Sequence, residues 1–220
     1  MESRKTIFRI ETLSEEINPE WTVVFQSTFK DKLVNYLEEY EKTKHCLLFQ
    51  GNTTFWLQHS AMQASLFLPL ASNDEKIRDI IVRLLRLHFE FINTNSSSLN
   101  SQNNSLSYFE LYHLAYTLQL AYIFYLRTEE ICQFSLLFSS ASARVLNVWE
   151  EGAIRSNLTG VMGKDLCIES ATHLEEIFSN ITRHADLGNQ ASKVIALLKK
   201  TNSIPISKEQ EFFQRGMKTI

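Results

Sequence analysis

Apolar residues recur every three or four positions along most of the chain, which is the period of an amphipathic α-helix. The clearest instance covers residues 73–92, where isoleucine, leucine and phenylalanine side chains share one stripe with His88. Ser72 and Glu75 have the spacing of a capping box, in which the two side chains bind free backbone amides at a helix start. The sequence therefore predicts a helix over residues 73–92.

The same period predicts helices on both sides of this segment. Asn18 and Pro19 are typical of a helix start, because Asn accepts hydrogen bonds from free amides and Pro suits the first helical position. Pro69 is expected to end a helix, and Gly188 to separate two others. Apolar and polar residues alternate over residues 6–11 too briefly to predict a strand. Further helices are expected over residues 19–43, 53–68, 165–184 and 190–200, with a short one after Pro205.

Residues 108–126 are apolar on nearly every side, so we expect this helix to be central and the most buried. A second capping box, formed by Ser107 and Glu110, precedes it. Thr128 is predicted to begin the next helix and Gly152 to end it. The two helices are expected to form a tight antiparallel hairpin.

Residues 93–107 consist mostly of Asn and Ser, which predicts a flexible loop. This loop is either an internal domain boundary or a long surface loop within one bundle. The chain has only 6 Gly and 3 Pro, which leaves little material for hairpin turns. We predict one all-α domain over residues 1–220, packed as an irregular bundle or short stack of seven to eight helices with the central hairpin inside it.

Charge and cysteine content narrow the setting of the protein. A formal net charge of -3 gives no global attraction for a phosphate backbone, so nucleic-acid binding is not indicated. Cys46, Cys132 and Cys167 are an odd number of widely spaced cysteines, which is typical of reduced thiols. Polar interruptions in the apolar helices argue against membrane insertion. We therefore expect a cytosolic or nuclear protein; the oligomeric state is left open.

Two short motifs suggest chemistry but lack required parts. Glu110 and His113 have the Glu-x-x-His spacing of di-iron helical bundles, yet no other histidine in the chain has a glutamate three positions before it. Gly163 and Lys164 are similar to the glycine-lysine pair of a phosphate-binding loop. There, Leu158 occupies the position of the first required glycine. We interpret this segment as a loop between helices.

The cysteines do not complete a catalytic or metal site either. Cys167 and His173 are the closest thiol and base in one helix, but six residues turn their side chains about 120° apart. His45 and Cys46 lack the paired ligand spacing of a structural zinc site. We expect no catalytic residue, no cofactor and no metal.

The excess of aromatic residues suggests how the protein works. Individual rings are expected to fill the core, but some tyrosines of the central helix are expected to line a groove for a partner helix or peptide. These residues are Tyr108, Tyr112, Tyr116, Tyr122 and Tyr125. The predicted function is a non-catalytic adaptor or complex subunit that binds another protein through an apolar helical groove.

Two alternative functions stay open. The first is a small ligand-binding protein or enzyme with a buried polar site around His59, His113 and Cys167. The second is a chromatin or transcription-associated regulatory factor, which requires the lysines of the C-terminal tail to lie on one face.

Overall fold

The helical period gives an all-α structure, as predicted. The computed structural model describes residues 2–31, 34–35, 38, 54–94, 111–155, 161–201 and 203–204. Short π-helical segments follow α2 and α10, at Gln26–Lys30 and Ile177–Ile181. Within the described residues the α-helices are α1 (Glu2–Ile17), α2 (Pro19–Phe25), α4 (Thr54–Ser65), α5 (Leu68–Ala71), α6 (Glu75–Thr94), α8 (His113–Thr128), α9 (Leu136–Arg155), α10 (Lys164–Glu176) and α11 (Ala185–Lys200).

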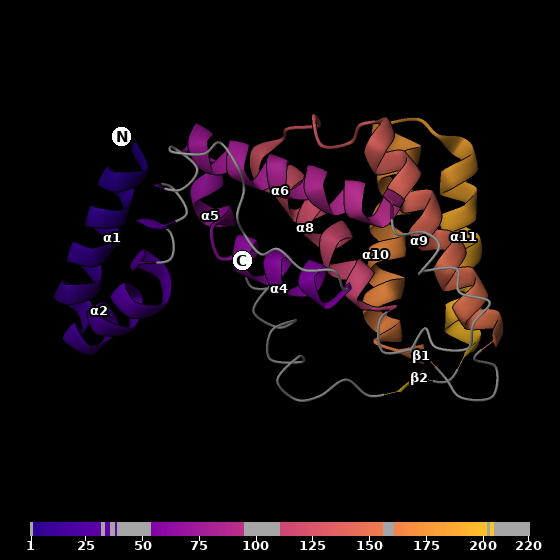
Figure 1. The fold of residues 1–220 in the computed structure, drawn as a ribbon, viewed down its shortest axis with the longest axis horizontal. Helices are drawn as coiled ribbons and strands as arrows, with labels where there is room; N and C mark the ends of the chain where they lie inside the picture. Colours follow the sequence, from indigo (N-terminus) through magenta and orange to yellow (C-terminus); the bar gives the residue numbers. More distant parts are fainter. Residues whose placement is uncertain are drawn as a thin grey trace.

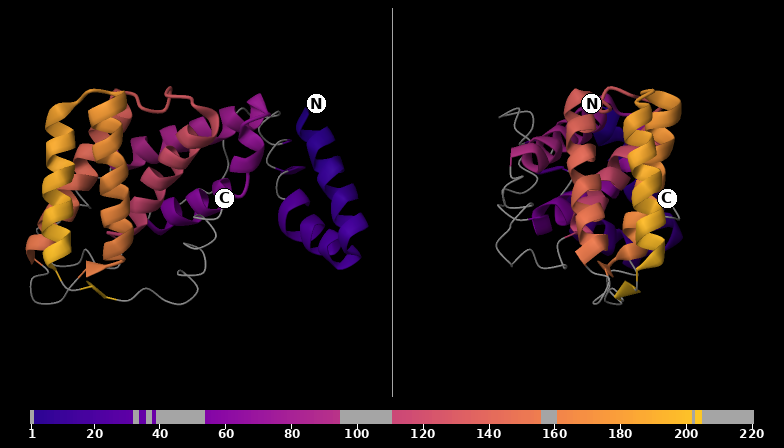
Figure 2. Two further views of the ribbon diagram at one scale, coloured as in Figure 1. Left: turned by 180° about the vertical axis from the view of Figure 1, so that it is seen from behind. Right: turned by 90° about the vertical axis from the view of Figure 1, so that its right-hand side faces the viewer.

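The helices form a bundle with a helical pair at one end (Figure 1). Helices α9, α10 and α11 stand side by side at one end of the elongated molecule, and α1 and α2 pack on each other at the other end (Figure 2). Between these ends, α4, α5, α6 and α8 form the middle of the bundle. No described helix is long enough and apolar enough to cross a lipid bilayer.

Helix α8 is buried along most of its length, with every residue from His113 to Tyr122 nearly inaccessible to solvent. The structure does not confirm the predicted hairpin of this helix with the next one. Helix α8 packs mainly against α4 and α10, whereas α9 packs mainly against α6 and α11. The most apolar helix is therefore covered by helices distant in the sequence.

The connection between α8 and α9 explains this difference. Thr128 was expected to begin a helix, but it is the last residue of α8. Glu129 follows in the left-handed region, with φ of 58°, and its amide donates to the carbonyl of Tyr125. A left-handed residue with this hydrogen bond ends a helix. Helix α9 begins only at Leu136 and continues through Gly152, so Gly152 is not a C-cap.

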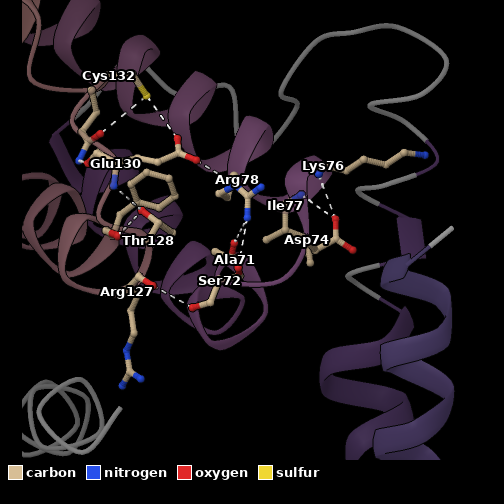
Figure 3. Close-up of polar contacts among 12 residues, drawn as sticks. Ala71, Ser72, Asp74, Lys76, Ile77, Arg78, Arg127, Thr128, Glu130 and Cys132 are labelled. Carbon is tan, nitrogen blue, oxygen red and sulfur yellow. Dashed lines mark hydrogen bonds and ion pairs between the residues drawn. The ribbon is translucent and has the colours of Figure 1, made fainter.

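The starts of α2 and α6 lie close to the predicted positions, and the capping residue differs at one of them. Asn18 accepts from the amide of Glu20, as expected. At α6, Asp74 performs this role, because its carboxylate accepts from the amides of Lys76 and Ile77 (Figure 3). The Ser72 hydroxyl instead donates to the carbonyl of Arg127 at 2.9 Å.

Other predicted boundaries shift. Residues 6–11 belong to α1, and Pro69 lies inside the short α5 instead of ending a helix. Gly188 lies inside α11, and the break falls at Arg183, whose φ is 56°. Residues 93 and 94 extend α6, and the rest of the predicted loop, the capping box of α8 and the helix after Pro205 lie outside the described residues.

A short parallel ladder is the one strand pairing within the described ranges. Strand β1 (Val161–Met162) pairs with β2 (Ser203–Ile204), with Val161 opposite Ser203. The Lys164 ammonium donates to the carbonyl of Thr201 at 3.1 Å beside this ladder. The segments that flank α10 and α11 are thereby joined.

Candidate functional site

Polar side chains converge where α4 packs against the first turn of α8. We call this set the polar cluster; it consists of Gln58, His59, Tyr112, His113 and Tyr116. His59 is exposed, whereas the other members are buried. The cluster therefore extends from the molecular surface into the core.

The rings of the first turn of α8 contact one another. Tyr112 and Tyr116 are four residues apart, so they lie on one helix face, with ring centroids 6.3 Å apart. The ring of His113 meets that of Tyr112 edge to face at 4.4 Å. Tyr112 thus connects the other two aromatic members of the polar cluster.

His113 is held in its neutral form. Burial, and to a smaller extent the nearby charge of His59, lower its pKa to about 4. Neutral imidazole has one nitrogen that donates and one that accepts a hydrogen bond. At neutral pH, the His113 ring therefore carries one donor and one acceptor nitrogen.

The Tyr116 hydroxyl is also kept neutral. Burial raises its pKa, Tyr112 and the Cys167 thiol of α10 act in the same direction, and the Gln58 side chain acts in the opposite direction. The Cys167 thiol is itself buried, and burial raises its pKa. Both groups are therefore uncharged at neutral pH, and Cys167 is a poor nucleophile.

Gln58 is the most informative member of the polar cluster. Its side chain is 3% exposed, yet its Oε1 atom has no hydrogen-bond partner among the described residues. A buried carbonyl oxygen without a partner destabilises the fold by about 1–3 kcal/mol. Such an atom can accept a hydrogen bond from a water or from a ligand hydroxyl.

A second group of buried polar residues is structural instead. His88 of α6 contacts the Ser60 hydroxyl through Nε2 at 2.7 Å and the Thr117 hydroxyl through Nδ1 at 3.0 Å. Because Ser60 donates to the carbonyl of Trp56, its oxygen is left to accept from Nε2. Both ring nitrogens are then satisfied, and burial lowers the pKa of His88 to about 3. This histidine joins α4, α6 and α8.

The tyrosines predicted to line a docking groove are mostly in the core. Tyr112, Tyr116 and Tyr122 are buried, Tyr125 is partly buried, and Tyr108 lies outside the described residues. Tyr122 donates to Glu176 at 2.7 Å and stacks on His173, with ring centroids 4.0 Å apart. Large rings fill the space between helices better than small side chains do. These buried rings do not form an exposed surface.

The other candidate motifs have structural roles. Gly163 adopts a left-handed conformation before α10, and Lys164 binds a backbone carbonyl, so this segment is not a phosphate loop. The Cys167 thiol helps to raise the pKa of Tyr116, whereas the His173 ring stacks on Tyr122. The two residues therefore interact with different parts of α8. Across the described ranges, no three His, Cys, Asp or Glu side chains are grouped to hold a metal ion. Glu110, His45, Cys46 and the tail after Ile204 lie outside those ranges.

A groove of about 530 Å³ lies elsewhere, between α6 and the start of α9. Its lining is mainly apolar, and Arg86, at its edge, already pairs with Glu90 at 3.1 Å. Cys132, an exposed residue in the lining of this groove, has a thiol whose pKa is raised by partial burial and by the neighbouring Glu130. The groove therefore lacks the convergent polar groups that the polar cluster contains. Its lining residues are Val82, Arg86, Phe89, Cys132, Gln133, Ser135, Leu136 and Leu137.

The fold is similar to that of a solved glycan-processing enzyme. No known protein family matches the sequence, and no curated protein matches it. A solved structure of a metal-independent alpha-mannosidase from Streptococcus pneumoniae, in a non-productive substrate complex with alpha-1,6-mannobiose, aligns with a TM-score of 0.68. The alignment covers 90% of this chain at 17% identity, and the chain spans 61% of the length of that enzyme. At this identity the similarity establishes the fold.

This similarity corrects the predicted function. The sequence led us to expect a non-catalytic adaptor, because the convergent polar groups of an enzyme were not visible in it while apolar helical surface was plentiful. The structural neighbour is an enzyme that processes N-linked glycans, which contradicts the adaptor prediction. The apolar faces are used inside the bundle, where α8 is enclosed by α4 and α10.

Proposed function

We propose that this chain is a mannosidase-like, glycan-processing protein that binds an α-mannoside at the polar cluster. The observation that carries the proposal is the convergence of buried neutral polar groups at the α4–α8 contact, within a fold shared with a mannosidase. The ligand of this proposal is a sugar, and it replaces the protein partner expected from the sequence.

The chemistry of the polar cluster suits a sugar. A glycan presents many hydroxyl groups, each of which donates and accepts hydrogen bonds. Gln58 offers a buried acceptor, and the neutral imidazole of His113 lies in the same cluster. A site built to bind hydroxyls discriminates strongly against ligands that lack them, because its buried polar groups are then left unpaired.

Hydrolysis of a glycosidic bond requires acidic groups in addition to the groups that bind the sugar. Glycoside hydrolases use two carboxyl groups, one on each side of the bond that breaks. Asp165, in the first turn of α10, acts electrostatically on Cys167, which in turn acts on Tyr116. We propose Asp165 as one carboxyl group of a hydrolytic reaction.

Binding is tested by calorimetric titration of the full chain with alpha-1,6-mannobiose. We expect saturable binding that weakens about tenfold or more in Gln58→Leu, since this change removes the acceptor while keeping the side-chain volume. His184→Gln, a change at an exposed histidine outside the polar cluster, is the matched control and should leave the affinity unchanged. Absence of binding by the unaltered chain, or equal affinity in Gln58→Leu, would overturn the proposal.

Hydrolysis is tested separately by measuring free mannose released from the same disaccharide. We expect release to fall by at least a hundredfold in Asp165→Asn, because this variant loses a carboxyl group that transfers a proton. Release that persists at the original rate in this variant would show that Asp165 is assigned wrongly.

A further inference from the structure

The first turn of α8 carries much of the polar cluster, but no side chain among the described residues is seen to cap it. Tyr112 occupies the N-cap position without a side-chain hydrogen bond to the free amides of the helix. Residues such as Ser, Thr, Asp and Asn usually supply that bond. The position of this turn must therefore depend on contacts from other helices.

Trp149 of α9 supplies one such contact. Its indole Nε1 donates to the carbonyl of Leu111 at 2.9 Å, and the ring is fully buried. Leu111 directly precedes Tyr112, so this bond fixes the backbone at the point where the chain enters α8. The indole nitrogen is only a donor, which makes the bond specific to Trp at this position.

Two glycines allow the same pair of residues to pack closely. A Cβ atom at Gly152 of α9 would lie 2.6 Å from Cδ1 of Leu111. A Cβ atom at Gly163 would lie 2.6 Å from Cβ of Tyr112, and the φ of Gly163 is 63°. Gly163 requires glycine, because its φ is positive and the close atom is a Cβ, whereas a Cβ at Gly152 would displace the end of the Leu111 side chain.

We infer that Trp149, Gly152 and Gly163 form a clamp on Leu111 and Tyr112, and that Trp149 is a positioning residue for the polar cluster. This inference rests on the proposed function for its ligand, an α-mannoside. The clamp holds the Tyr112 ring against His113 and Tyr116, so that the neutral donors and acceptors keep a fixed arrangement before a sugar binds. Preorganised groups of this kind bind more tightly because they lose less freedom on binding.

The clamp is tested with Trp149→Phe in the full chain, by two measurements. The first is the NMR chemical shift of the His113 ring protons without ligand, since these protons lie in the ring-current field of Tyr112. The second is the affinity for alpha-1,6-mannobiose. We expect the His113 signals to move and the affinity to fall about tenfold, the loss that corresponds to about 1.4 kcal/mol of binding free energy.

Tyr122→Phe is the matched control for the lost hydrogen bond. It removes a bond of similar length from the opposite half of α8, where Tyr122 contacts Glu176. If Trp149 had only a structural role, Trp149→Phe and Tyr122→Phe would have similar effects on the His113 signals and on the affinity. We expect Tyr122→Phe to leave both the His113 signals and the affinity unchanged.

A second pair of variants avoids the tryptophan. Gly152→Ala places a methyl group against Leu111, whereas Gly188→Ala places one in α11, 3.2 Å from the Ser179 hydroxyl. We expect only Gly152→Ala to move the His113 signals. Unchanged His113 signals in both Trp149→Phe and Gly152→Ala would overturn the clamp. Absence of mannobiose binding by the unaltered chain would overturn the proposed function, and the His113 signals would still decide the clamp.

Discussion

Buried His88 makes stability depend on pH. Its pKa of about 3 in the folded state lies below the ordinary value of 6.5, which applies in the unfolded chain. As the pH falls below 6.5, the unfolded state therefore binds a proton first, and the free energy of unfolding decreases until the pH reaches about 3. The slope in this window is about 1.4 kcal/mol per pH unit for one group.

We expect the free energy of unfolding to fall by about 2 kcal/mol between pH 6.5 and pH 5 because of His88. Urea unfolding at the two pH values measures this difference. His88→Gln removes one of two titrating groups and should reduce the dependence by about half, because His113, with a pKa of about 4, contributes a similar amount in this window. An equally steep dependence in His88→Gln would contradict the prediction.

Single residues differ in how far their roles could be predicted. His88 falls on the apolar stripe of its helix, so the local pattern indicates its burial. Gln58 carries no such signal, because its role depends on contact with Tyr116, which is distant in the sequence. His59, His113 and Cys167 were suggested as a possible buried site, but the sequence contained nothing to place Gln58 or Trp149 beside them.

Among the contacts between helices, those of Arg78 connect the α5–α6 turn to the segment between α8 and α9 (Figure 3). Its guanidinium pairs with Glu130 at 2.9 Å and donates to the carbonyl of Ala71 at 3.0 Å. These contacts tie together two turns that no regular hydrogen-bond pattern holds. They help to fix the direction in which the chain leaves α8.

Arg78→Ala is expected to lower the free energy of unfolding by about 1–2 kcal/mol, because it leaves backbone carbonyls and a partly buried carboxylate without their donor. Arg86→Ala on the same helix is the matched control. Arg86 makes an exposed pair with Glu90, and such pairs contribute about 0.5 kcal/mol or less. Chemical denaturation of both variants checks this ranking, and equal losses would contradict it.

Local sequence predicted the helices better than their partners. The period of apolar residues is a property of each segment, so α6, α10 and the start of α2 were expected nearly where they lie. The choice of α4 and α10 as partners of α8 depends on contacts between distant segments. The end of α8 at Thr128 was missed, because Thr128 followed by two acidic residues also fits a helix start.

At the scale of the whole molecule, burial is uneven. Helices α1 and α2 pack chiefly on each other among the described elements, and apolar side chains such as Phe8 and Ile17 are about two-thirds exposed, at 70% and 67%. Helix α8 lies in the core. Regions with few buried contacts open more readily than core helices do.

Amide hydrogen exchange should therefore be fastest in α1 and α2 and slowest in α8. Mass spectrometry of exchanged peptides measures this order in the native protein. Protection of α1 equal to that of α8 would show that the helical pair is stabilised by contacts beyond those described.

The small ladder of β1 and β2 has a mechanical consequence. Together with the bond from Lys164 to Thr201, it joins the two ends of the segment that contains α10 and α11. Tension applied to the chain beyond Ile204 would be shared with Val161 instead of pulling directly on the last turn of α11. Fraying from the end of α11 would then require rupture of the ladder, so a two-residue pairing protects a helical hairpin much longer than itself.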